Sequence, residues 1–262
     1  MSIMRAVQNA ASGVKAAEIA MGVVANGFAK LQTYGGKVNW VEVGSMGSQT
    51  VLSPGASTET GANGVGAQLG LGVTVKAVHK DMTQGAIQES DSPFHMAIHG
   101  AGFFQFIRPD GRVVFSRKGL CRLDRSRNIV NSDGYILAPG IQIPEGYEEV
   151  SISQDGQISV KMPGQNEMQN VGQIELARFI EPRALGEEGD YYVANSESGE
   201  PEIGTPDSGG RGLLKSHFLE ACNGSAIKLM GDMIQAQRNH GQCLAIIKKA
   251  DEMLDAQTRI VS

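Results

Sequence analysis

The sequence predicts an α+β protein in which helices at the two ends of the chain pair as a coiled coil, with a mainly antiparallel β domain between them. Three observations predict it: a long apolar seam near the N-terminus, a second apolar helical face near the C-terminus, and strand and turn patterns in the middle. A lone helix cannot bury such a seam, so each end needs a partner helix. This layout favours an assembly module over an enzyme.

The N-terminal helix is predicted by nine residues that step alternately by four and three positions. On an α-helix this spacing keeps all of them on one side, which is the pattern of a coiled coil. The seam consists of Ile3, Val7, Ala10, Val14, Ala17, Met21, Val24, Phe28 and Leu31.

Three glycines, Gly13, Gly22 and Gly27, lie inside this predicted helix. Each costs up to about 1 kcal/mol relative to alanine in a helix interior. They have two interpretations: they soften the helix, or they allow close packing between subunits, with the helix ordered on assembly. The tandem glycine at 35–36 ends the helix, and we assign residues 1–40 to this part of the coiled-coil domain.

A segment rich in glycine, serine and threonine follows the helix. Between Gly44 and Gly72 there are eight glycines, four serines and three threonines, and Glu59 is the single charged residue. Such a segment has too little apolar surface to fold alone. Residues 41–72 are therefore either a flexible linker or an extended arm that lies against a neighbouring subunit.

Strand patterns begin at Val73, where apolar and polar residues start to alternate. Several Asp-Gly turn dipeptides follow, and Asp155-Gly156 between Ile152 and Ile158 is a strong hairpin signal. Short connections between short strands favour an antiparallel or mixed sheet. The sequence therefore predicts a β-rich outer domain over residues 73–222.

The C-terminal helix is predicted over about 225–257, within a segment that we assign to residues 223–262. Its apolar face is broader and less regular than the first, because Gln237 and His240 interrupt it and Gly241 weakens its middle. The face consists of Met230, Met233, Ile234, Cys243, Leu244, Ile247, Ala250 and Leu254.

Composition argues against several classes of function. The net charge is −5 and no basic block is present, which argues against nucleic acid and anionic membranes as partners. The three cysteines, Cys121, Cys222 and Cys243, match no zinc or redox spacing and are expected to be free. The first residues are amphipathic and lack the apolar core of a cleavable signal, so the protein is cytoplasmic or is exported without cleavage.

The sequence predicts no catalytic, cofactor or metal site. His95 and His99 are four apart on an expected strand, where they would lie about 13 Å apart and could not share a metal. The glycine clusters lack both the dinucleotide and the P-loop spacing. No small-molecule substrate is therefore expected.

The order of motifs along the chain resembles the bacterial flagellar axial proteins of the rod and hook family, and is most similar to its distal rod members. The motifs that carry this resemblance are residues 97–104 (AIHGAGFF), 109–111 (PDG), 115–119 (FSRKG), 133–135 (DGY), 219–220 (LE), 233–238 (MIQAQR) and 250–254 (ADEML).

This resemblance implies a structural subunit of the distal rod of the flagellar basal body. Such subunits polymerise helically into a rigid hollow drive shaft that spans the periplasm and transmits motor torque to the hook. The implied partners are further copies of the chain, proximal rod proteins, hook protein, the L and P ring proteins and the type III export apparatus, which exports subunits without cleaving a signal peptide. The alternatives are a hook or proximal rod subunit and, from another class, a secreted β-rich adhesin or enzyme.

Two sets of residues are expected to act in assembly. The first is an interface formed by the nine N-terminal seam residues together with Met233, Ile234, Gln237, Arg238, Leu244, Ile247 and Leu254. The second is an arm that, by the resemblance, keeps the tube straight, represented by Ser53, Pro54, Gly55, Gly61 and Gly64.

Overall fold

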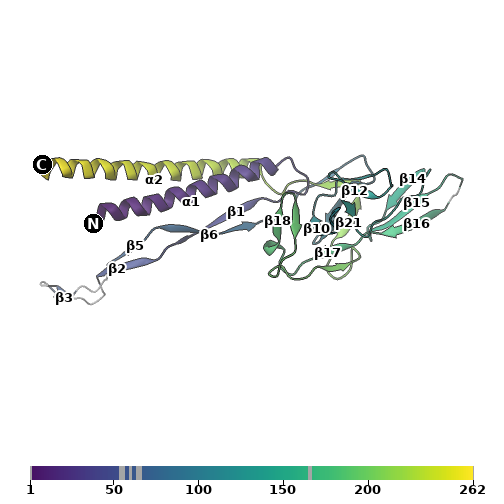
Figure 1. Ribbon diagram of the computed structural model, residues 1–262, viewed down its shortest axis with the longest axis horizontal. Coiled ribbons are helices and arrows are strands. Elements are labelled where there is room, and N and C mark those ends of the chain that lie inside the picture. The colour runs from purple at the N-terminus through teal and green to yellow at the C-terminus, as the bar shows by residue number, and fades with distance from the viewer. Residues whose placement is uncertain (1, 53–56, 59–60, 63–66, 165–166, 262) are drawn as a thin grey trace. The chain divides into compact units, whose positions relative to one another are not determined.

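The computed structural model describes the chain except for residues 1, 53–56, 59–60, 63–66, 165–166 and 262 (Figure 1). The chain divides into two compact units, which we name by their content. The helix unit comprises Met1–Phe28, Asn39–His79 and Ser225–Ser262, and the β unit comprises Ala29–Val38 and Lys80–Gly224. The predicted α+β class is confirmed, with a helix at each end and mainly antiparallel strands between them.

The helix unit contains the two long helices of the protein, α1 (Ser2–Lys30, whose last residues belong to the β unit) and α2 (Ala226–Val261). Gly13 of α1 lies against Cys243 of α2, and further along Glu18 approaches His240. Because rising numbers on α1 meet falling numbers on α2, the helices run antiparallel, as their ribbons show in Figure 1.

The remainder of the helix unit is a ribbon of paired strands within residues 39–80. β1 (Asn39–Ser45) pairs with β6 (Val73–Lys80), and β2 (Ser48–Leu52) pairs antiparallel with β5 (Ala67–Gly70). Two short strands, β3 (Ser57–Thr58) and β4 (Gly61–Ala62), also pair. The glycine-rich composition did not predict this pairing, because a two-stranded ribbon is held by backbone hydrogen bonds that most side chains permit.

The β unit is built on a nine-stranded antiparallel sheet. Seven strands follow the order β11-β12-β13-β9-β10-β19-β18, and β17 pairs with both β9 and β20. The strands are β9 (Phe103–Ile107), β10 (Val113–Ser116), β11 (Cys121–Leu123), β12 (Ile129–Asn131), β13 (Ile136–Leu137), β17 (Leu176–Arg178), β18 (Gly186–Glu188), β19 (Tyr191–Val193) and β20 (Glu202–Gly204).

Smaller sheets complete the β unit. β14 (Glu149–Ile152), β15 (Gln157–Lys161) and β16 (Met168–Gln173) form a three-stranded sheet, in which Ile152 pairs with Ile158 as the hairpin signal predicts. Two further pairs are antiparallel: β7 (Ile87–Glu89) with β22 (Phe218–Glu220), and β8 (Met96–His99) with β21 (Leu213–Ser216). A 3-10 turn, η1, spans Pro182–Ala184.

The core of the β unit is apolar and well ordered in its packing. Met96 and Ile98 of β8 meet Phe104 and Phe106 of β9 and Ile158 of β15, and all five are fully buried. Residues 96–98 are all buried, so β8 is covered on both faces rather than on one. This packed core fixes the positions in the β unit from which the chain continues to the terminal helices.

Candidate assembly interface

The N-terminal seam is largely turned into the helix unit. Ala10, Ala17 and Val24 are buried, and Ile3, Val7, Val14, Met21 and Phe28 are half-buried. Leu31 lies just beyond α1, where it is half-buried within the β unit. The structure therefore places eight of the nine seam residues on α1, along the side that the rest of the helix unit covers.

Two of the helix glycines differ in their surroundings within the subunit. An ideal Cβ at Gly13 would lie 2.7 Å from the Sγ atom and 3.9 Å from the Cβ atom of Cys243. At Gly22 the same atom would meet nothing within 4 Å. Gly13 thus permits the close approach of α1 and α2, whereas Gly22 only lowers helix propensity.

The covered face of α2 has a more regular spacing than the sequence analysis recognised. The residues turned inward step by four and three without a break: Leu229, Met233, Ala236, His240, Cys243, Ile247 and Ala250. Leu229, Ala236 and His240 were not expected on this face, and Cys243 and Ala250 were on the expected apolar face but not among the expected interface residues. His240 is half-buried within the seam, with its Nε2 atom 3.8 Å from Glu18 Oε1, so it continues the seam rather than interrupting it.

Several residues of the expected α2 apolar face and interface point away from the covered face. Met230, Ile234 and Leu244 have 57%, 50% and 46% of their surface exposed. Gln237, Arg238 and Leu254 are exposed as well. Met230, Ile234, Gln237 and Leu244 lie one position after the inward residues, which on an α-helix is a rotation of about 100°. The described part of α2 therefore carries two stripes, one covered by the helix unit and one exposed.

The strand ribbon is fastened to α1 by two polar side chains that the sequence analysis missed. Asn9 Nδ2 donates to the carbonyl oxygen of Gly70 at 3.0 Å, and Ser12 Oγ accepts from the amide of Val73 at 3.1 Å. Between these contacts Gly72 has φ of +104°, and a Cβ there would collide with Ser12 Oγ. Of the expected arm residues, Gly61 pairs with Thr58. The others, Ser53, Pro54, Gly55 and Gly64, lie outside the described residues.

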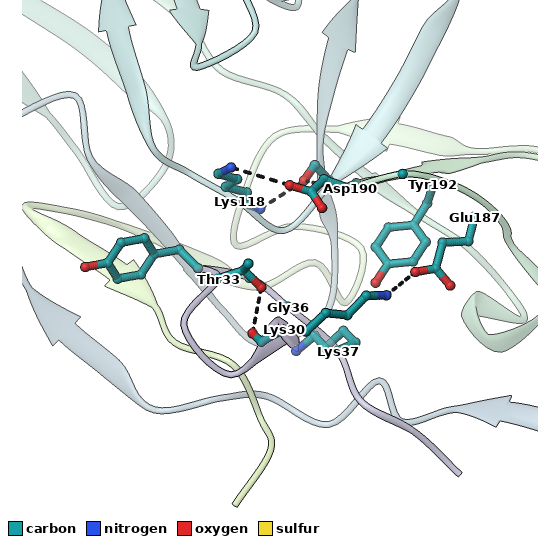
Figure 2. Close-up of a pocket in the computed structure, with 12 residues that line it drawn as sticks. Lys30, Thr33, Gly36, Lys37, Lys118, Glu187, Asp190 and Tyr192 are labelled. Carbon is teal, nitrogen blue, oxygen red and sulfur yellow. Dashed lines mark hydrogen bonds and ion pairs between the residues drawn. The ribbon is translucent and has the colours of Figure 1, made fainter. Parts of the chain in front are cut away.

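A pocket in the β unit lies where the chain continues past α1 (Figure 2). Lys30 pairs with Glu187, and Lys118 Nζ lies 3.6 Å from Asp190 Oδ2. Lys37, which also lines this pocket, forms an ion pair with Glu220. Each of these lysines thus has a carboxylate partner, so the lining is a set of neutralised pairs and not a cluster of free cations that would bind an anion.

No metal-binding group is found among the described residues, where no three His, Cys, Asp or Glu side chains converge. His95 and His99 lie at the two ends of β8, the first beside Ser90 Oγ at 2.5 Å and the second beside Gln84. Complete burial raises the pKa of the Cys121 thiol to about 12, so this cysteine packs as an apolar side chain. Neither of the described helices has a stretch apolar enough to span a bilayer.

Comparison with known proteins agrees with this architecture. Residues 97–160 match the family described as the flagellar hook protein FlgE/F/G D1 domain. The flagellar basal-body rod protein FlgG of Caulobacter vibrioides is 34% identical over 262 residues, which cover 99% of this chain and 100% of the relative. FlgG of Bacillus subtilis is 30% identical over 96% of this chain and 97% of its own length. The hook protein FlgE of Helicobacter mustelae is 34% identical over 52% of this chain and only 30% of its own length.

The fold, the terminal helices and these matches define the class as a structural axial protein of the bacterial flagellum, not an enzyme. The similarity to the rod proteins is nearly full-length, whereas the similarity to the hook protein covers half of the chain. The chain belongs to the FlgG family of flagellar basal-body rod proteins.

Proposed function

We propose that the protein is the distal rod subunit, which polymerises helically with copies of itself into a rigid, hollow drive shaft that carries motor torque to the hook. The observation that supports this most directly is the exposed apolar stripe on α2, formed by Met230, Ile234 and Leu244. A monomer gains nothing from leaving three large apolar side chains half in water along one side of a helix. A second copy of the chain would cover them.

Within one subunit, α1 and α2 form an antiparallel coiled coil in this proposal. The covered residues of α2 step by four and three from Leu229 to Ala250, as the seam of α1 does. That spacing matches the 3.5-residue repeat of supercoiled helices. The close approach at Gly13 and Cys243 supports the same pairing.

The exposed stripe then serves contact between subunits. Covering the exposed halves of Met230, Ile234 and Leu244 contributes about 1 kcal/mol each, or about 3 kcal/mol per contact. Gln237 and Arg238 lie within or beside the stripe and would set the register of the partner helix. In this proposal the stripe meets a different surface of the neighbouring copy, through a head-to-tail contact whose rotation does not close a ring, and such a contact generates a helical polymer.

Residues 41–72 act, in the same proposal, as the arm that holds neighbouring subunits apart and keeps the tube straight. The described part of this segment is paired strand fastened to α1 through Asn9 and Ser12, which supports a stiff projection over a loose linker. Deleting residues 53–66 is expected to leave a tube that bends. A tube of the deleted protein that stays straight would contradict this role of residues 41–72. The alternatives to the distal rod subunit are a hook or proximal rod subunit.

The remaining partners follow from the family resemblance. They are the proximal rod proteins, the hook protein, the L and P ring proteins around the rod, and the type III apparatus that exports the chain without a cleaved signal. The assembled rod would span the periplasm. Export through a narrow channel requires an unfolded chain, and the exposed stripe of α2 would gain its burial only on docking.

Polymerisation of matched variants tests the proposed function. Ile234→Asp places a charge in the exposed stripe, while Gln242→Asp places the same charge at an exposed position outside it. Loss of about 2 kcal/mol per contact raises the critical concentration about 30-fold for Ile234→Asp. The control should polymerise within about twofold of the wild type. Equal polymerisation of both variants, measured by sedimentation and electron microscopy, would contradict the proposed interface.

A further inference from the structure

We propose that Lys37, Arg117 and Glu220 form a buried ionic clamp that fixes the two segments through which the β unit connects to the terminal helices. These segments are residues 29–38, which contain the last two residues of α1 and the chain after it, and residues 221–224, which precede α2. The clamp lies wholly within the β unit. Its role in carrying torque rests on the proposed function, whereas its role in holding the two segments does not.

Glu220 is the centre of the clamp. It ends β22 and its side chain is fully buried. One carboxylate oxygen, Oε1, accepts from Lys37 Nζ at 2.6 Å and from the amide of Gly85 at 2.9 Å. The other, Oε2, lies 3.6 Å from Arg117 Nη1. One carboxylate therefore joins two cations that are far from it in the sequence.

Each cation is in turn fixed by a backbone carbonyl. Lys37 Nζ donates to Thr83 O at 2.6 Å, and Arg117 Nη2 donates to Gly100 O at 2.6 Å. The guanidinium of Arg117 also lies over the ring of Phe103, with its carbon 5.5 Å from the ring centroid. Neither cation can turn away to another partner without breaking these contacts.

The backbone of the first segment is held at the same place. The amide of Gly35 donates to the carbonyl oxygen of Glu220 at 2.7 Å, so this residue binds the segment through both main chain and side chain. Gly35 has φ of +68°, and a Cβ there would lie 2.7 Å from Arg117 C and Lys118 N. The segment therefore packs directly on the backbone that carries Arg117.

The second segment is tied to the first by Asn223. Its Oδ1 atom accepts from the amide of Val38 at 3.0 Å, and its Nδ2 atom donates to Asp81 O at 2.8 Å. The amide of Asn223 also bonds to Gly36 O at 3.4 Å. The two segments, which are remote in sequence, are thus held to each other by directional bonds as well as to the clamp.

The charges make this arrangement specific. Burial lowers the pKa of Lys37 and of Arg117, and the carboxylate of Glu220 opposes that shift in both. Buried ion pairs add little net stability over apolar packing, but removing one partner leaves an uncompensated buried charge. Apolar contacts are non-directional and can slide, whereas hydrogen bonds to a buried carboxylate hold one geometry. Segments that carry torque between the β unit and the terminal helices are therefore held better by hydrogen bonds to a buried carboxylate than by apolar contacts alone.

Hydrogen exchange of the full-length monomer tests the clamp without assembly. Lys37→Met removes one cation, and Lys30→Met is the matched control in the same segment, because its pair with Glu187 is partly exposed. For Lys37→Met we expect the amides of Gly35 and Val38 to exchange at least about tenfold faster. The unpaired buried carboxylate of Glu220 lowers the free energy needed to open residues 29–38 locally, while the core of the β unit stays folded. Amides of β9 should change less than about twofold, and Lys30→Met should match the wild type.

Glu220→Gln is a second variant in case Lys37→Met does not fold. It keeps the shape and an acceptor for Gly85 but leaves Lys37 and Arg117 without their counter-charge. Unchanged exchange in residues 29–38 for the folded variants, or an equal rise throughout the β unit, would overturn the clamp.

Tubes assembled from the same proteins test the mechanical role. Tubes of the clamp variants should twist further under a given torque than tubes of the wild type and of Lys30→Met, as measured by bead rotation. Equal torsional stiffness would overturn the role in torque even where exchange rises. Failure of the wild type to form tubes would contradict the proposed function. It would leave the clamp to be judged by hydrogen exchange of the monomer, which does not depend on assembly.

Discussion

The contact between Gly13 and Cys243 allows a sharp test of how closely the terminal helices pack. Gly13→Ala adds a methyl group that would lie 2.7 Å from Cys243 Sγ. The added methyl improves helix propensity by about 1 kcal/mol, but overpacking of this kind costs about 1–3 kcal/mol. We therefore expect Gly13→Ala to be neutral or to lower the free energy of unfolding of the helix unit by up to about 2 kcal/mol.

Two companion variants separate the propensity effect from the steric effect. At Gly22 an added methyl meets nothing within 4 Å, so Gly22→Ala should stabilise α1 by close to the full propensity gain. In the double variant Gly13→Ala with Cys243→Ala, the new methyl faces a Cβ atom at 3.9 Å, an ordinary contact. The double variant should therefore recover the stability that Gly13→Ala loses, with a coupling energy of about 1–3 kcal/mol.

Trp40 gives a local signal for this cycle. It is the one tryptophan of the chain, and it lines a groove with Val24 of α1 and Leu229 of α2. Urea unfolding followed by its fluorescence and by helical circular dichroism should report the helix unit. If Gly13→Ala stabilised the protein as much as Gly22→Ala does, the helices would not approach at this point and the argument would fail.

Three further outcomes are expected. Burial, and to a smaller extent the charge of the nearby His217, lower the pKa of His95 below 6.5. The unfolded chain therefore binds more protons near this pH than the folded chain, and the free energy of unfolding should fall as pH drops through 6.5. Urea midpoints between pH 7.5 and pH 5 measure this, and His95→Gln should flatten the curve. In the native protein the half-buried Cys243 should react with iodoacetamide at pH 8 before the fully buried Cys121, whose modification should require unfolding. Mass spectrometry of timed samples measures the order, and earlier modification of Cys121 would contradict its burial. Phe104→Ala should lower the free energy of unfolding of the β unit by about 3–5 kcal/mol, and a loss under 1 kcal/mol would contradict its place at the centre of the core.

The helices were predictable because their signal is local. The alternating steps of four and three in residues 3–28 place one face inward whatever the partner is, and α1 ends within a few residues of the expected position. The seam of α2 was harder to recognise because its inward stripe includes His240 while its exposed stripe includes Ile234. Hydrophobicity alone therefore mixed two faces, whereas regular spacing would have separated them.

The strand ribbon and the clamp could not be predicted in the same way. The pairing of β2 with β5 depends on backbone hydrogen bonds, which leave little trace in a segment of small polar residues. Lys37 and Glu220 are separated by 183 positions, and only the folded sheet brings them together. The sequence did indicate the motifs that contain Arg117 and Glu220, but as marks of family resemblance rather than as members of one site.

The central claim, that copies of this chain assemble through the exposed stripe of α2, is tested most directly by imaging the polymer. Purified protein would be concentrated until it sediments, and the product would be reconstructed by helical electron cryomicroscopy. We predict a straight hollow tube in which Met230, Ile234 and Leu244 are buried against a second copy. A polymer in which these three side chains remain exposed to solvent, or a chain that stays monomeric at any attainable concentration, would contradict the account.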